Sequence, residues 1–124
     1  MKKQRRKNFE IRFCEAILEK RPNCVGVLIS LGDTYTKGGF YQEGLGVDRR
    51  LAILRPEDPV IRYNLACSLS LIGQSQEALE ELKKAILLGY DEYSYILRDS
   101  DLENVRKLAS FKIFFNKLRN LKKE

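Results

Sequence analysis

Apolar residues recur along this chain every three or four positions, which is the spacing of one face of an α-helix. The first apolar stripe lies in residues 9–21 and ends before Pro22, a residue that helix interiors do not tolerate. Further stripes predict helices at residues 24–37, 40–54, 59–72 and 76–88. No segment alternates apolar and polar residues over the length of a strand, so the pattern predicts an all-α fold.

Residues at the expected helix ends support these boundaries. Asp58 can cap a helix that begins at Pro59, because proline at the first helical position loses no hydrogen bond. Gly39 and Gly73 stand where helices are expected to end, because glycine adopts the left-handed backbone conformation of a helix end without steric cost. Ser75 is expected to cap the helix that follows Gly73. Since the turns between helices are short, consecutive helices should fold back on each other as hairpins.

Two consecutive 34-residue stretches, 25–58 and 59–92, follow the same plan. Small residues recur at matched positions, where Gly32 and Gly44 return as Ala66 and Ala78. Six residues recur unchanged after one period: Leu31, Gly39, Gln42, Glu43, Leu45 and Leu54 return as Leu65, Gly73, Gln76, Glu77, Leu79 and Leu88. A helical period of this length is typical of an interaction scaffold whose units stack on their neighbours.

These residues resemble the tetratricopeptide repeat (TPR) family, in which each repeat is a hairpin of a first helix, called A, and a second helix, called B. Members of that family have a Leu-Gly pair and a Tyr in helix A and small residues in helix B. The matching residues are Leu31-Gly32, Tyr35, Gly44 and Pro56 in the first repeat, and Leu65-Ala66, Ala78 and Ala85 in the second. The pattern departs from the family at Leu51, Leu69 and Tyr90. The resemblance implies an α-solenoid of helix-turn-helix hairpins in a right-handed superhelical stack, which works as a non-catalytic protein-protein interaction scaffold.

The resemblance extends past the two repeats at both ends. Residues 8–24 look like a helix B without its helix A, and Ser100-Asp-Leu-Glu103 reads as a capping box that opens a short helix. A stripe of Phe111, Phe114 and Phe115 follows, similar to the end module that closes bacterial repeat arrays. We therefore expect a basic flexible tail at 1–7, a half-repeat helix at 8–24, repeats at 25–58 and 59–92, and capping helices at 93–124.

The TPR resemblance also implies a binding site, because helix A lines the concave surface in that family. The peptide-binding candidates are Ile29, Asp33, Thr36, Lys37, Tyr63, Asn64, Cys67, Ser70 and Leu71. In members that grip a C-terminal carboxylate, Lys and Asn do so from several helices; here Asn64 and Arg98 match, whereas Ile29 and Asp33 take the first-repeat places. An acid where a cation is needed argues against such tail binding, and Asn64 has a structural explanation that we prefer.

Composition and charge narrow the classes of function. With 124 residues and 44% hydrophobic content, the chain can form one domain with a real core. No run of apolar residues is long enough for a membrane span, and the basic start lacks the apolar stretch of a secretory signal, so we expect a cytoplasmic protein. Three unpaired cysteines suit reduced thiols.

Candidate chemistry is scarce. The chain has no histidine, which removes Cys-His and Ser-His-Asp arrangements, so we expect no enzyme, no cofactor and no metal site. The expected partner is a protein or peptide. The alternative is a nucleic-acid-associated adaptor that uses the five cationic side chains of residues 1–7, although these lack aromatic neighbours for base stacking.

The N-terminal helix raises one further hypothesis. Phe9, Ile11 and Phe13 are expected on different sides of it, so one neighbouring helix cannot bury all three. A remaining apolar strip would favour self-association or docking to another protein.

Overall fold

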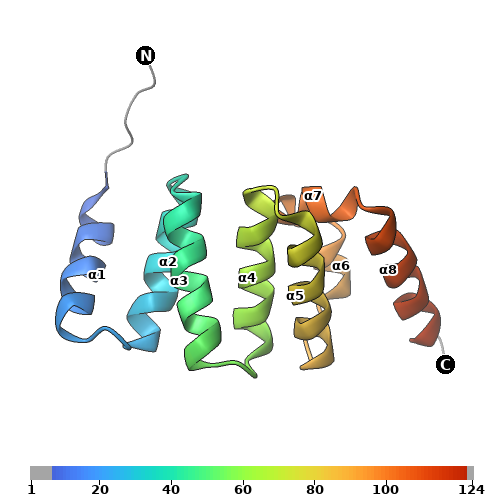
Figure 1. Ribbon diagram of the computed structural model, residues 1–124, viewed down its shortest axis with the longest axis horizontal. Helices are drawn as coiled ribbons and strands as arrows, with labels where there is room; N and C mark the ends of the chain where they lie inside the picture. Colours follow the sequence, from blue (N-terminus) through green and yellow to red (C-terminus); the bar gives the residue numbers. More distant parts are fainter. Residues whose placement is uncertain (1–6, 123–124) are drawn as a thin grey trace, which may run out of the picture. The chain divides into compact units, whose positions relative to one another are not determined.

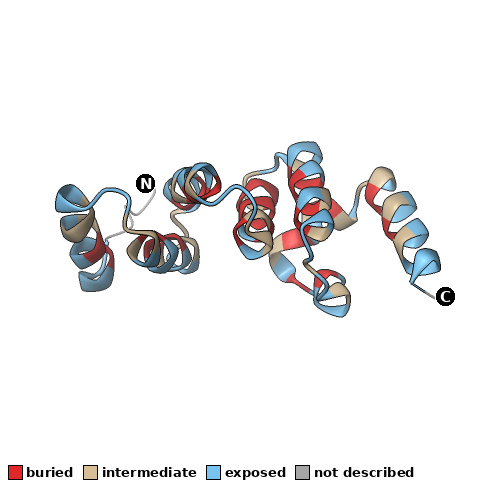
Figure 2. Cartoon of the chain, turned by 90° about the horizontal axis from the view of Figure 1, so that it is seen from below, coloured by how far each residue is buried: buried red, intermediate tan, exposed pale blue. Residues whose placement is uncertain are grey.

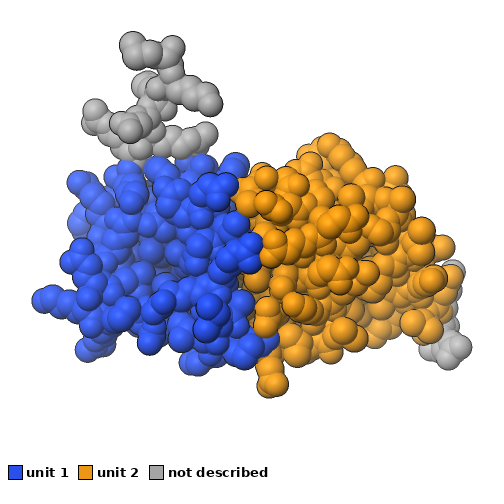
Figure 3. Space-filling model, viewed as in Figure 1, with its two compact units in different colours: residues 1–56 blue, residues 57–124 orange. Residues whose placement is uncertain are grey.

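A computed structural model describes residues 7–122, and these residues form eight α-helices and one 3₁₀ turn without a strand. The all-α prediction is therefore confirmed for this part of the chain. The chain divides into two compact units, residues 1–56 and 57–124, which are coloured separately in Figure 3. None of the described helices combines the length and apolarity needed to cross a membrane.

Figure 1 labels the helices in chain order. The first unit contains α1 (Phe9–Lys20), α2 (Val25–Lys37) and α3 (Tyr41–Leu54). The second unit contains α4 (Pro59–Leu71), α5 (Ser75–Leu87), α6 (Tyr93–Ile96), η1 (Ser100–Leu102), α7 (Glu103–Arg106) and α8 (Ala109–Leu121).

In the first unit, α2 and α3 form a closely packed pair and α1 packs on α2. The core is built from Ile11 and Cys14 of α1 and Leu31 and Tyr35 of α2. Gly44 is buried where α3 crosses α2, and a Cβ placed there would lie 2.9 Å from Thr36 Oγ1. The small residues predicted at this crossing are thus required by the close approach of the two backbones.

In the second unit, α4 and α5 form the equivalent pair. Asp58 caps α4 as expected, because its Oδ1 accepts hydrogen bonds from the backbone N of Val60 at 2.9 Å and of Ile61 at 3.2 Å. Ala66 and Ala78 have no exposed surface. Figure 2 shows buried residues concentrated on α4 and α5, so this pair carries the main core of the unit.

Two predicted caps are wrong. Ser75 is the first residue of α5 rather than its cap, and Gln74 precedes it without a capping side chain. The expected capping box at Ser100 is replaced by Asp99, whose Oδ1 accepts a hydrogen bond from the backbone N of Asp101 at 3.0 Å. Asp99 takes this role because Tyr63 and Cys67 of α4 also donate to its carboxylate.

The segment after α5 folds back onto the α4/α5 pair. Leu102 of η1 and Val105 of α7 have no exposed surface. Arg106 Nη1 donates to the backbone oxygen of Ile96 at 2.8 Å and to that of Asp99 at 2.6 Å, which ties the ends of this segment together. We call residues 93–106 the cap segment.

The described surface of α1 corrects the expectation for its aromatic residues. Ile11 is buried, whereas Phe9 and Phe13 are 74% and 56% exposed. The two phenylalanine rings stack on each other with centroids 5.8 Å apart, so they share one side of the helix rather than lying on different sides. An exposed apolar pair does remain, which keeps the association hypothesis open.

Candidate functional site

The predicted site residues on α2 form an exposed stripe. Ile29, Asp33 and Lys37 follow one another at four-residue intervals, and Ile29 is 44% exposed. Lys37 Nζ lies 2.9 Å from Asp33 Oδ2, and this hydrogen-bonded pair raises the pKa of Lys37. Because the ion pair is internal, the stripe is close to neutral, and an apolar side chain stands beside it. We call Ile29, Asp33 and Lys37 the α2 stripe.

Thr36 does not belong to the α2 stripe. Its Oγ1 donates a hydrogen bond to the backbone oxygen of Gly32 at 3.0 Å. Since the same atom lies 2.9 Å from the place of a Cβ on Gly44, Thr36 stands at the crossing with α3. Thr36 is half-buried between the helices, so its predicted contact with a ligand stays a prediction.

Three of the candidates on α4 are closed off by the protein's own chain. Tyr63, Cys67 and Ser70 are 5%, 8% and 0% exposed. Tyr63 Oη donates a hydrogen bond to Asp99 Oδ2 at 2.5 Å, and Asn104 Nδ2 donates to the backbone oxygen of Ser70 at 2.8 Å. The cap segment thus covers the side chains that the sequence offered to a peptide.

The two helices A therefore differ at equivalent positions. Ile29 and Asp33 of α2 correspond, one repeat of 34 residues later, to Tyr63 and Cys67 of α4. The first pair belongs to the open stripe, whereas the second pair is buried under the cap segment. On α4, Asn64 remains exposed and Leu71 is half-buried.

The buried cluster on α4 is polar but chemically quiet. Burial raises the pKa of the Tyr63 hydroxyl, with added contributions from Cys67 and from the hydrogen bond to Asp99. Burial also raises the pKa of the Cys67 thiol, whose Sγ lies 3.7 Å from Asp99 Oδ2, so both groups stay protonated and donate to the carboxylate. A protonated, buried thiol is a poor nucleophile, which gives this cluster a structural role.

Aromatic rings enclose the same cluster. The Tyr63 and Tyr90 rings stack with centroids 4.1 Å apart and an interplanar angle of 6°. Burial, as the largest cause, raises the pKa of Tyr90 to about 12. Tyr95 tilts against Tyr63 at 6.4 Å, so the hydroxyl-carboxylate contact is shielded from water.

Sequence reasoning missed the role of Asp99. In the sequence, Asp99 stands out only as the first residue of an Asp-x-Asp-Leu stretch. Its partner Tyr63 lies 36 residues earlier in the chain. Nothing in local spacing links the two, because the contact depends on how the cap segment returns to α4. Arg98, the other carboxylate-grip candidate, is exposed and lies over the Tyr95 ring at 5.6 Å.

Carboxylates and thiols are the side chains of this chain that could bind a metal ion. Within residues 7–122, no three such side chains come together in a way that could hold a metal ion. Cys14, Cys24 and Cys67 are free thiols, and the first and last of these are buried.

The fold and the site define an all-helical protein in which consecutive helices pack in pairs, as in a helical repeat. No model of a known protein family matches the chain. The chain is similar to a chloroplastic protein of Arabidopsis thaliana, with 35% identity over 83 residues. That region covers 64% of this chain and 25% of the relative, so the chain spans about a quarter of the length of the curated protein it matches.

Proposed function

We propose that this chain is a non-catalytic interaction scaffold of the tetratricopeptide repeat type, stacked as a right-handed solenoid, which binds a protein or peptide segment on the open face of α2. The observation that carries this proposal is the α2 stripe. It presents Ile29 beside the Asp33–Lys37 ion pair, whereas the equivalent face of α4 is already occupied.

The covered face of α4 supports the proposal by internal analogy. There, a segment of short helical turns from the same chain is held by a hydroxyl-carboxylate hydrogen bond, by Asn104 donating to a helix carbonyl, and by stacked tyrosines. The face of one helix thus accommodates such a segment with both polar and apolar contacts. By its repeat register, α2 offers the equivalent face to a segment from another protein, with Ile29 and Asp33 in place of Tyr63 and Cys67.

The chemistry of the stripe restricts the partner. Asp33 and Lys37 neutralise each other, so a partner must either match both charges or rest on Ile29 and leave the pair in water. We propose a segment with an apolar side chain for Ile29 and a mixed pair of charges beside it. A polyanion such as nucleic acid gains little from this stripe because Lys37 is already paired with Asp33.

The test is quantitative affinity capture with the intact chain. Wild type is compared with Ile29→Asp and with the matched control Ile53→Asp, which also changes an exposed isoleucine, 79% exposed, on α3. Partners of the α2 stripe should be enriched by wild type and by the control, and lost with Ile29→Asp. If Ile29→Asp retains every protein that wild type captures, the stripe is not the binding surface.

A further inference from the structure

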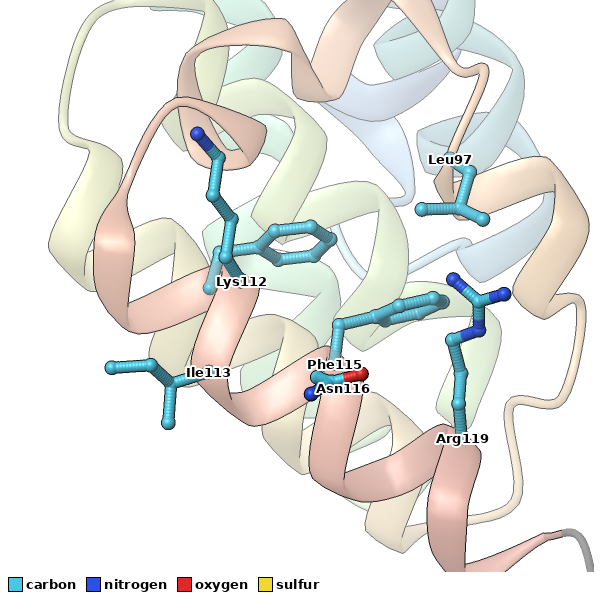
Figure 4. Close-up of a pocket in the computed structure, with 7 residues that line it drawn as sticks. Leu97, Lys112, Ile113, Phe115, Asn116 and Arg119 are labelled. Atoms are coloured by element: carbon cyan, nitrogen blue, oxygen red, sulfur yellow. The ribbon is translucent and has the colours of Figure 1, made fainter.

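A groove runs along the inner edge of α8 in the second unit (Figure 4), with a volume of about 450 Å³. Phe111 and Phe115 form its floor, with ring centroids 5.3 Å apart, and each is only 3% exposed. Leu97, after α6, lines the opposite side. None of the lining residues belongs to the α2 stripe or to the covered face of α4.

Cationic side chains stand at the two ends of this groove. Figure 4 shows Lys112 at one end and Arg119 at the other, with Phe115 between them. Both cations are exposed, and none of the described lining residues is acidic. The whole of α8, Ala109–Leu121, contains no Asp or Glu, so the helix itself offers no acid to neutralise them. The groove therefore attracts negative charge at both ends.

Aliphatic side chains near the groove remain partly in water. Leu97 is 44% exposed and Ile113 is 59% exposed. Burying either side chain against an apolar partner would lower the free energy of the complex. Asn116 adds an exposed amide to the lining, which can hydrogen bond to a peptide backbone. An occupant that matches the groove has an apolar middle and acidic ends.

We propose that this groove docks an acidic-apolar segment of a partner protein, in which two carboxylates enclose an apolar side chain. Lys112 and Arg119 are two helical turns apart, or about 10.5 Å along the axis at 1.5 Å per residue. In an extended peptide only every second side chain faces the groove, so acids four residues apart, about 13 Å at 3.3 Å per residue, come nearest to this distance with an apolar residue midway between them. The expected core is therefore Asp or Glu at both ends of a five-residue segment, with Leu, Ile, Val or Phe at its third position.

Two other occupants fit the charges less well. A second copy could offer Phe9 and Phe13 of α1, but Arg12, which is exposed on the same helix, would then bring a third cation to Lys112 and Arg119. Like charges at a contact are costly. An anionic lipid surface would recruit the cations of α8 without regard to the groove, including Lys117, which is exposed and not part of the lining.

Lys117 supplies the matched control for the experiment. Fluorescein-labelled peptides with the acidic-apolar cores described above, and counterparts with Asn or Gln in place of the acids, are titrated with the intact chain at physiological salt. Fluorescence anisotropy reports binding to wild type, to Lys112→Glu/Arg119→Glu and to Lys117→Glu. Vesicles containing phosphatidylserine are tested with the same proteins, and melting curves verify that each variant is folded.

The proposal predicts micromolar binding of at least one acidic peptide, with the double variant weaker by about tenfold or more and Lys117→Glu within about twofold of wild type. Three results would overturn it. The amide peptides could bind as well as the acidic ones, or none of the peptides could bind below about millimolar concentration. Alternatively, Lys117→Glu could weaken binding as much as the groove variant, with vesicles bound in preference to peptides.

Discussion

Replacing Asp99 by alanine should destabilise the second unit strongly, because Asp99 joins the cap segment to α4. Asp99 is only 6% exposed, and its carboxylate accepts from Tyr63 Oη at 2.5 Å and from the backbone N of Asp101 at 3.0 Å. Alanine removes both acceptors at once. The Tyr63 hydroxyl would then stay buried under the cap segment without its charged acceptor.

The magnitude follows from these contacts. A hydrogen bond to a charged group contributes about 1.5–3 kcal/mol to stability, and loss of a capping side chain costs about 1 kcal/mol. Removing a buried carboxylate also removes its desolvation penalty, which offsets part of this sum. We expect a net loss of about 2–4 kcal/mol for Asp99→Ala. Tyr63→Phe, which removes the hydroxyl and retains the cap of η1, should lose about 1.5–3 kcal/mol.

Urea unfolding followed by circular dichroism and tyrosine fluorescence measures these differences, and the chain has no tryptophan to obscure the tyrosine signal. Hydrogen exchange of the cap segment shows whether the loss is local to it. The double variant completes a thermodynamic cycle. Since Asp99 and Tyr63 act through the same hydrogen bond, their effects should be non-additive by about 1–3 kcal/mol. Additive effects, or a loss below about 1 kcal/mol for Asp99→Ala, would refute the assigned role of this contact.

Four further sets of substitutions test other parts of the structure. Ala66→Leu should cost about 1–3 kcal/mol in thermal unfolding, because Ala66 is fully buried at the helix crossing; an unchanged melting curve would show that the crossing lies elsewhere. Gly44→Ala should lower the melting temperature because its Cβ would lie 2.9 Å from a side-chain oxygen, whereas Gly46→Ala, which has open space, should raise stability by about 1 kcal/mol, and the opposite order would contradict the packing. The pKa of Glu15 lies below its ordinary value of 4.5: burial alone would raise it, but hydrogen bonds from a lysine and a tyrosine outweigh burial. Its stabilising contribution is thus present above pH 4.5 and lost as the pH falls through the lower folded-state value, so Glu15→Gln should flatten the melting temperature between about pH 6 and 3, and an unchanged acid profile would speak against it. If wild type self-associates in moderate salt, its sedimentation coefficient should rise with concentration, and this rise should be absent in Phe9→Asp. If both proteins are monomers at high micromolar concentration, the self-association hypothesis is wrong.

Local signals were sufficient to predict most of the helices. Asp58 and Pro59 mark the start of α4 by a cap and a fixed φ angle, and both act within one helical turn. Gly73 has a φ of +86°, which is the left-handed backbone expected for a residue that ends a helix. The small residue at position 44 was also predictable, since close packing of two helices leaves no room for a side chain.

The burial of the candidate site residues was less predictable, because it depends on contacts between residues that are far apart in the sequence. Ser100 and Asp99 are both good capping residues, and the choice falls to Asp99 because Tyr63 holds its carboxylate. Tyr63 itself looked like a groove residue by register, but the returning cap segment buries it. Thr36 was assigned to the open face by the same register, although its hydroxyl turns to the backbone of Gly32.

The contacts of the cap segment distinguish α4 from α2. Its carboxylate, Asp99, needs a hydroxyl donor at the position that Tyr63 holds, and the first helix pair has Ile29 there, which donates nothing. Asp33 would in addition bring a second carboxylate where Cys67 now donates its thiol. The donors that hold Asp99 are thus present on α4, and the residues at the equivalent positions of α2 cannot replace them. A longer array made by inserting a repeat before residue 93 would close properly only if the inserted helix A carried tyrosine and a small donor at those two positions.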